Sequence, residues 1–160
     1  MWLYSTTEYY LMSDGIFSKE ILIANWLRGY LTLNNFSIIQ LVTSGGQSHM
    51  SISYKDTQSN ASRCCFPDLI CYTNEKIIIG EIKPKFSYAD KIKLLSIKDS
   101  NDGIHNIHNI CMRRIPNFKI RPVQFVLIHG DYSRHADPEI DQLVLLSPQT
   151  AIELGAMNKA

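Results

Sequence analysis

The feature that most constrains the fold of this chain is a pair of apolar runs on either side of a short polar stretch. Residues 63–72 and 76–83 are rich in isoleucine, leucine and cysteine, and Thr73-Asn74-Glu75-Lys76 joins them. Two runs of this kind around a tight turn predict a β-hairpin. The chain therefore contains at least one antiparallel pair of strands, against which other elements can be placed.

Apolar periodicity predicts further elements around this hairpin. Residues 17–31 carry one broad apolar face at helical spacing, which predicts an amphipathic helix. We expect strands at residues 36–43, 49–54, 122–129 and 142–146, helices at 87–97 and 150–157, and an exposed loop at 99–109. In the helix at 87–97, Ile92 and Leu95 are expected to face the core and the lysines to face solvent. The order predicts a mixed α/β (α+β) sheet flanked by helices.

Length and composition bound the class of protein. The 160 residues fit one domain, and a hydrophobic content of 45% excludes global disorder. No apolar run approaches the ~20 residues that span a bilayer, so no membrane association is expected. The first residues lack the basic and apolar regions of a signal peptide. We therefore expect a soluble cytoplasmic (intracellular) protein.

Positive charge is concentrated in the middle of a nearly neutral chain. The net charge is +1, but residues 81–121 carry nine basic and four acidic side chains. Such a segment can form a phosphate-binding face, although solvated lysines on a helix are the commoner explanation. The candidates for contact with a nucleic-acid backbone are Lys85, Lys91, Arg113 and Arg114.

The four cysteines do not form a recognisable metal motif. No two of them stand in a CxxC pair, and the apolar neighbours of Cys64, Cys65 and Cys71 suggest small buried side chains in a strand. Structural zinc with the histidines of the second half stays an alternative, but the spacing matches no standard zinc site.

Three ionisable side chains interrupt the apolar strands of the predicted hairpin: Asp68, Glu81 and Lys83. If the turn is centred between residues 74 and 75, Asp68 lies opposite Glu81, and directly opposed side chains have Cβ atoms about 5 Å apart. Two carboxylates at that separation repel each other unless one is protonated or a cation lies between them. An oxygen-seeking divalent ion, Mg²⁺ or Mn²⁺, is the natural cation.

Glu20 is a second unexpected carboxylate. It lies close to the middle of the apolar face of the helix at 17–31, where a glutamate is unfavourable unless it meets a metal ion, a lysine or a helix-end amide. The alternative is that it stays hydrated in the first helical turn, where the macrodipole favours it.

These groups suit phosphodiester hydrolysis. Asp68, Glu81 and Glu20 would hold one or two metal ions, and Lys83, on the same strand face as Glu81, would orient or deprotonate a water or neutralise the developing charge. The structural alternative is a cluster in which Lys83 forms a salt bridge with Asp68 or Glu81.

Pro67-Asp68, twelve intervening residues and Glu81-Ile82-Lys83 resemble the signature of the PD-(D/E)xK nucleases. The resemblance implies a restriction-endonuclease-like αβββαβ core over about residues 16–130, followed by a C-terminal extension over 131–160. It also implies that Asp68, Glu81 and the carbonyl of Ile82 bind the metal ion, that Lys83 is the catalytic lysine, and that Glu20 is the helix acid of several subgroups. Glu-x-Lys-Pro is similar to the transposon-end-cleaving endonucleases, and the compact domain is similar to archaeal Holliday junction resolvases; neither subgroup is assigned.

The sequence thus predicts a Mg²⁺-dependent endonuclease, with Mn²⁺ able to substitute and DNA as the expected partner. A homodimer or a larger nucleoprotein complex is the expected assembly. Two alternatives remain open: a ribonuclease with the same residues, and a nuclease-like binding or assembly subunit without turnover.

Overall fold

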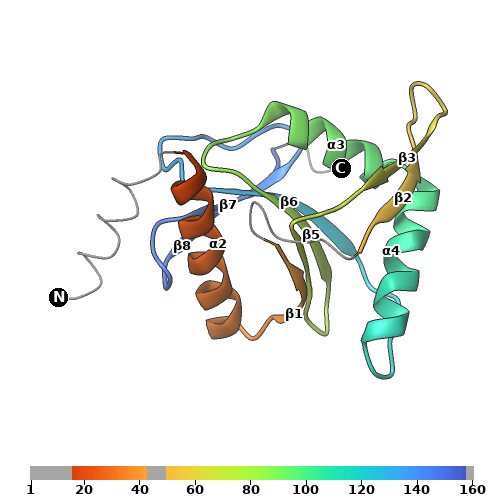
Figure 1. Ribbon diagram of the computed structural model, residues 1–160, viewed down its shortest axis with the longest axis horizontal. Coiled ribbons are helices and arrows are strands. Elements are labelled where there is room, and N and C mark those ends of the chain that lie inside the picture. The colour runs from red at the N-terminus through yellow and green to blue at the C-terminus, as the bar shows by residue number, and fades with distance from the viewer. Residues whose placement is uncertain (1–15, 43–49, 158–160) are drawn as a thin grey trace.

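The computed structural model describes residues 16–42 and 50–157. Three helices and eight strands lie in these ranges (Figure 1). The elements are α2 (Ile16–Leu33), β1 (Ser37–Leu41), β2 (Ile52–Lys55), β3 (Ser62–Cys65), β4 (Leu69–Tyr72), β5 (Ile77–Ile82), α3 (Tyr88–Lys98), α4 (Asn101–Arg114), β6 (Val123–His129), β7 (Asp141–Leu145) and β8 (Ala151–Leu154).

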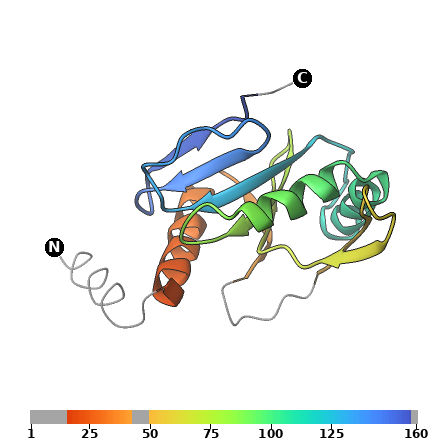
Figure 2. The ribbon, with the colours of Figure 1, turned by 90° about the horizontal axis from the view of Figure 1, so that it is seen from above.

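Six of the strands form one mixed sheet in the order β1-β4-β5-β6-β7-β8. The pairs β1–β4, β4–β5 and β7–β8 are antiparallel, whereas β5–β6 and β6–β7 are parallel. The remaining strands, β2 and β3, form a separate antiparallel pair. Figure 2 shows β7 and β8 at one side of the molecule and the β2–β3 pair at the other. The expected mixed α/β architecture is confirmed at this level.

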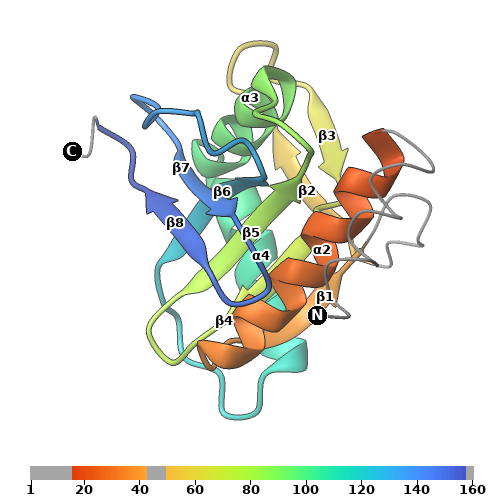
Figure 3. The same cartoon turned by 90° about the vertical axis from the view of Figure 1, so that its left-hand side faces the viewer.

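The sheet is covered on both faces, and each face has its own apolar cluster. Helix α2 packs on one face through Ile23, Ala24, Leu27 and Leu31, and crosses the strands in Figure 3. The opposite face packs against α3, α4 and the β2–β3 pair. Strand β5 lies between these layers with all six residues buried, which explains its run of isoleucines.

The predicted hairpin and its register are confirmed. Tyr72 pairs with Ile77 and Leu69 with Gly80, which is the alignment of a turn centred between residues 74 and 75. The helix predicted at 17–31 is α2, the helix at 87–97 is α3 with Ser87 as its N-cap, and the strands at 36–43, 122–129 and 142–146 are β1, β6 and β7. The short strand at 49–54 corresponds to β2, although His49 is outside the described residues.

One predicted strand is two strands in the structure. The run 63–72 divides into β3, which pairs with β2, and β4, which belongs to the large sheet. The break falls at Phe66-Pro67-Asp68, because a proline has no N–H to donate to a ladder. As a result Asp68 lies just before β4 rather than inside a strand, and Cys64 is exposed rather than buried.

The predicted loop at 99–109 is wrong, since these residues form most of α4. The polar sequence conceals an apolar stripe of Ile107, Ile110 and Cys111, all buried in the core. Ser100 caps the helix by accepting a hydrogen bond from the N–H of Gly103 at 3.1 Å.

The predicted terminal helix at 150–157 is also wrong. A turn at residues 147–150, in which Ser147 Oγ accepts the N–H of Thr150, sends the chain back alongside β7. Strand β8 thereby pairs with β7 and extends the sheet by one strand, which local helical propensity could not reveal.

The inward face of α3 differs from the expectation. Ile92 is 44% exposed and Leu95 is half-buried, whereas Leu94, Ile97 and the long side chain of Lys91 are buried. Lys91 is turned inward because its ammonium group lies 3.0 Å from Asp137 and 2.9 Å from Glu139. Within residues 16–42 and 50–157, no helix combines the length and apolar character needed to cross a membrane.

Gly103 lies where α4 meets α3, and a side chain there would clash. A Cβ atom at this position would lie 2.9 Å from the carbonyl oxygen of Ile97 and 3.2 Å from Cβ of Tyr54. We therefore predict that Gly103→Ala lowers the free energy of unfolding by about 1–3 kcal/mol, despite the higher helix propensity of alanine. Urea denaturation measures this, with exposed His105→Ala on the same helix as the control; equal stability of the two variants would contradict the packing described.

Candidate active site

The sequence-predicted site residues gather at the carboxyl end of β5. Asp68 precedes β4, Glu81 and Ile82 end β5, and Lys83 follows directly. In Figure 3, β5 points toward the end of the molecule at which α2 and α3 begin. Glu20, in the first turns of α2, is near enough to Lys83, Asp68 and Asp90 for their charges to shift its pKa. Asp68 and Glu81 still lie close together although the strand is interrupted at the proline. Leu69 pairs with Gly80, so the same register places Asp68 next to Glu81.

Asp68 is held by three hydrogen bonds that involve it or its neighbour. The amide of Gln40 donates to the carbonyl of Pro67 at 2.7 Å, and the N–H of Val42 donates to the carbonyl of Asp68 at 2.8 Å. The carboxylate Oδ2 accepts the backbone N–H of Ile82 at 2.9 Å. The side chain of Asp68 is therefore fixed across the end of the hairpin before any ligand binds.

The bond from Ile82 also fixes the direction of its own carbonyl group. In an extended strand the N–H and C=O of one residue point to the same side. Since the N–H of Ile82 points to Asp68, its carbonyl oxygen faces the same side, beyond the end of β4. The next amide, of Lys83, points the other way and donates to the carbonyl of Ile128 at 3.0 Å.

Glu81 is a carboxylate buried in the sheet, with only 3% of its surface exposed. Its Oε1 lies 2.8 Å from the ammonium group of Lys93 and accepts a weak hydrogen bond from the thiol of Cys65 at 3.7 Å. Burial and the adjacent Asp68 carboxylate raise the pKa of Glu81 to about 8, against the lowering effect of Lys93. The site therefore favours a proton or a further cation at this carboxylate.

Two residues of α3 that the sequence analysis missed complete the cluster. Lys93 bridges Glu81 and Asp90, whose Oδ1 lies 3.1 Å from the ammonium group. Asp90 Oδ2 is buried without a hydrogen-bond partner among the residues described. The i, i+3 spacing of Asp90 and Lys93 in the sequence could have predicted their ion pair. It could not have predicted that Lys93 also turns toward the sheet and contacts Glu81.

Glu20 and Lys83 lie at the edge of the cluster. Partial burial raises the pKa of Glu20, the nearby Lys83 lowers it, and the carboxylates of Asp68 and Asp90 raise it. Among the residues described, neither Glu20 nor Lys83 forms an ion pair within 4 Å. Lys83 is half-buried and keeps its ammonium group unengaged by a carboxylate, so the salt bridge of the structural alternative is not present in the described chain.

The donor set fits a small, oxygen-seeking cation. Asp68 and Glu81 offer carboxylates and Ile82 a carbonyl oxygen, and Lys93 and Asp90 form an ion pair beside Glu81. Carboxylate and carbonyl oxygens are the ligand atoms that Mg²⁺ and Mn²⁺ prefer. Within residues 16–42 and 50–157, no three His, Cys, Asp or Glu side chains are grouped closely enough to hold a metal ion by themselves.

The basic residues proposed for nucleic-acid contact differ in their surroundings. Lys85 is exposed two residues beyond Lys83, and its charge lowers the pKa of Asp131. Arg113 and Arg114 are exposed in the last turn of α4, which lies far from the start of α3 (Figures 1 and 3). Lys91 is buried and engaged with two carboxylates, so its ammonium group is not available to a nucleic acid.

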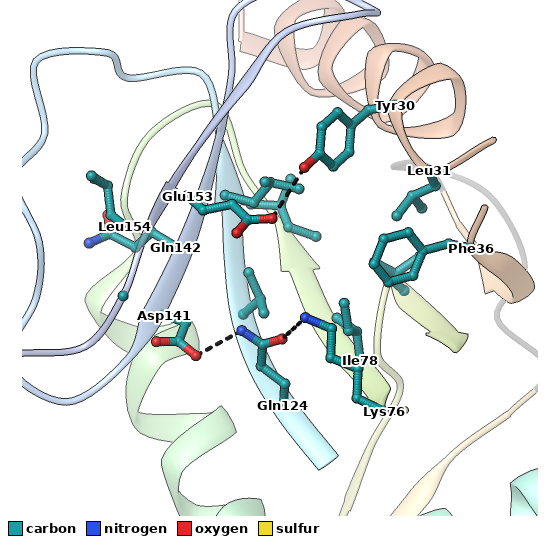
Figure 4. A pocket seen from close by; sticks show the side chains of 15 residues that line it. Tyr30, Leu31, Phe36, Lys76, Ile78, Gln124, Asp141, Gln142, Glu153 and Leu154 are labelled. Carbon is teal, nitrogen blue, oxygen red and sulfur yellow. Dashed lines mark hydrogen bonds between the residues drawn. The ribbon is translucent and has the colours of Figure 1, made fainter. Parts of the chain in front are cut away.

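A cavity of about 200 Å³ lies on the α2 side of the sheet, away from this cluster (Figure 4). Its polar residues bond to one another: Lys76 donates to Gln124 at 3.0 Å, and Gln124 donates to Asp141 at 2.8 Å. Tyr30 likewise donates to Glu153 at 3.2 Å. These polar groups already have hydrogen-bond partners within the protein. The acidic cluster, in contrast, includes the buried Asp90 Oδ2, which has no partner among the described residues.

Comparisons with protein-family models, with curated proteins and with solved structures found no match to this chain.

The raised pKa of Glu81 predicts a pH-dependent stability. The unfolded chain releases this proton near the ordinary pKa of 4.5, whereas the native chain keeps it up to about pH 8. Raising the pH from 5 to 9 in EDTA should therefore lower the free energy of unfolding, at up to about 1.4 kcal/mol per unit. Urea denaturation should show that Glu81→Gln, which mimics the protonated form, removes most of this slope.

The matched control for that measurement is Glu75→Gln in the exposed hairpin turn, which should leave the slope unchanged. An equal slope in wild type and in Glu81→Gln would contradict the account of this carboxylate.

Proposed function

We propose that this chain is a metal-dependent endonuclease that hydrolyses phosphodiester bonds in DNA. The observation that carries the proposal is the meeting of Asp68 and Glu81 at the end of one hairpin, in surroundings with more carboxylates than ammonium groups. Lys83 directly follows β5 and forms no ion pair within 4 Å among the described residues, although its charge lowers the pKa of Glu20. Acids that face each other and a free lysine are the groups that metal-assisted phosphoryl transfer requires.

The order of the elements supports a restriction-endonuclease-like core as part of this proposal. The expected helix, strand, hairpin, helix and strand correspond to α2, β1, β4–β5, α3 and β6. The β2–β3 pair and α4 are additions to that order, and β7 and β8 continue the same sheet beyond β6. The resemblance to the PD-(D/E)xK nucleases implies a site at the end of the hairpin, and the meeting of Asp68 and Glu81 there supports this part of the proposal.

Each residue has a distinct role in this proposal. Asp68, Glu81 and the carbonyl of Ile82 would hold Mg²⁺ or Mn²⁺, with Glu20 as an outer acid. The bound ion would polarise a phosphoryl oxygen and lower the pKa of a water molecule. The ammonium group of Lys83 would orient the attacking water and neutralise the charge that develops on the phosphate. Lys85 would contact the adjacent backbone of the nucleic acid.

The competing function is a nuclease-like binding or assembly subunit without turnover. One observation favours it: Lys93 already neutralises Glu81, and a permanent ion pair would keep a metal ion out. A ribonuclease would use the same residues, so only the substrate separates it from the enzyme proposed here.

The first test is a cleavage panel with plasmid, linear, branched and single-stranded DNA and with RNA, in Mg²⁺, Mn²⁺ or EDTA. We predict metal-dependent cutting of DNA that Asp68→Asn and Lys83→Met each reduce at least ~100-fold, the scale of a lost general acid–base or electrostatic group.

The matched controls are Asp102→Asn and Lys55→Met, both exposed and outside the cluster, which should cut like wild type. Circular dichroism verifies that each variant is folded. Cutting that survives Asp68→Asn, or that proceeds in EDTA, would contradict the proposal, and cutting of RNA alone would favour the ribonuclease.

A further inference from the structure

We propose that Lys93 is the resident counter-cation of Glu81 and competes with the divalent ion for this carboxylate, so that metal binding and release of Lys93 are one event. The inference deepens the proposed function and rests on it for the identity of the incoming ion. It assigns Lys93 and Asp90 of α3 a positioning role that the hairpin residues alone do not provide.

The ion pair between Lys93 and Glu81 is short, and only Lys93 has access to solvent. The Lys93 ammonium group lies 2.8 Å from Glu81 Oε1, a distance typical of a charge-assisted hydrogen bond. The side chain of Glu81 is 4% exposed, whereas that of Lys93 is 33% exposed. Lys93 can therefore withdraw toward solvent, but Glu81 must stay and then needs another cation or a proton.

A divalent ion between Asp68 and Glu81 would destabilise the ion pair between Lys93 and Glu81. Both cations would lie within a few ångströms of Glu81, in a partly buried site where charge repulsion is poorly screened. Occupancy by one therefore weakens occupancy by the other.

Asp90 is placed to keep the released lysine close to the site. Its Oδ1 already lies 3.1 Å from the Lys93 ammonium group, three residues away on the same helix. Its Oδ2 is buried and has no hydrogen-bond partner in the described chain, so it can take a second bond from the lysine. Lys93 thus exchanges one carboxylate for another as the ion binds, and returns when the ion leaves.

Lys83 provides a matched comparison. It belongs to the same cluster and carries the same charge, but it forms no ion pair with Glu81 or with any other described carboxylate. Removing Lys83 takes away one positive charge from the site, whereas removing Lys93 takes away the cation bound to the ligand itself. Only the second change should free Glu81 for a metal ion.

The test is the affinity for Mn²⁺ alone, followed by electron paramagnetic resonance of the free ion at pH 8.5 without nucleic acid. We expect Lys93→Met to bind Mn²⁺ roughly tenfold or more tightly than wild type, because loss of a buried ion-pair partner leaves Glu81 uncompensated. Lys83→Met should stay within about twofold to threefold of wild type, because its charge acts from a greater distance. Lys93→Arg, which keeps the cation, should restore the wild-type affinity.

Several outcomes would overturn the inference. They are an equal or weaker affinity in Lys93→Met, an equal gain in Lys83→Met, and no Mn²⁺ binding by wild type and Lys93→Met alike. If Lys93→Met does not fold, Lys93→Gln removes the charge with less change in shape and gives the same comparison. Failure of the nuclease proposal is distinguishable, because the cleavage panel then shows no cutting while the order of Mn²⁺ affinities still holds.

Discussion

A carboxylate buried at the end of the central strand imposes the constraint on which the site depends. Strand β5 pairs with β4 on one side and β6 on the other, and helices cover both faces of the sheet. Glu81 is therefore almost completely buried. Such a charge is expensive to bury unless it is paired, bonded or protonated. The surrounding side chains meet that need in part: Lys93 supplies a cation and Cys65 a weak donor, while Asp68 adds a second negative charge.

The fold brings these groups together because three elements begin and one ends at the same side of the molecule. Strand β4 begins just after Asp68, β5 ends at Ile82, and α2 and α3 begin nearby. Gln40 on β1 donates a hydrogen bond to the carbonyl of Pro67, so the connection between β3 and β4 is held against the large sheet. A site assembled on strand ends and helix starts is rigid, and this rigidity lets two like charges be held close together.

The hairpin and its acidic pair could be predicted because they depend on local pattern. Two continuous apolar runs and a four-residue turn define the register that aligns Asp68 with Glu81. Helix α4 and strand β8 were predicted wrongly because both depend on tertiary context. Three apolar side chains of a mostly polar stretch become buried in α4. Strand β8 forms because it can pair with the edge of β7. Lys93 was missed for a related reason. A lysine on a helix is usually solvated, and only packing of α3 against β5 shows that this one turns inward.

The most direct test of the central claim is a crystal structure of the chain grown with Mn²⁺, in which anomalous scattering locates the ion. The account predicts a peak between the carboxylates of Asp68 and Glu81, about 2.0–2.3 Å from an oxygen of each, with the Lys93 ammonium group moved from Glu81 toward Asp90. An empty site in which Lys93 still binds Glu81 at saturating Mn²⁺, or a peak bound only elsewhere on the molecule, would contradict it.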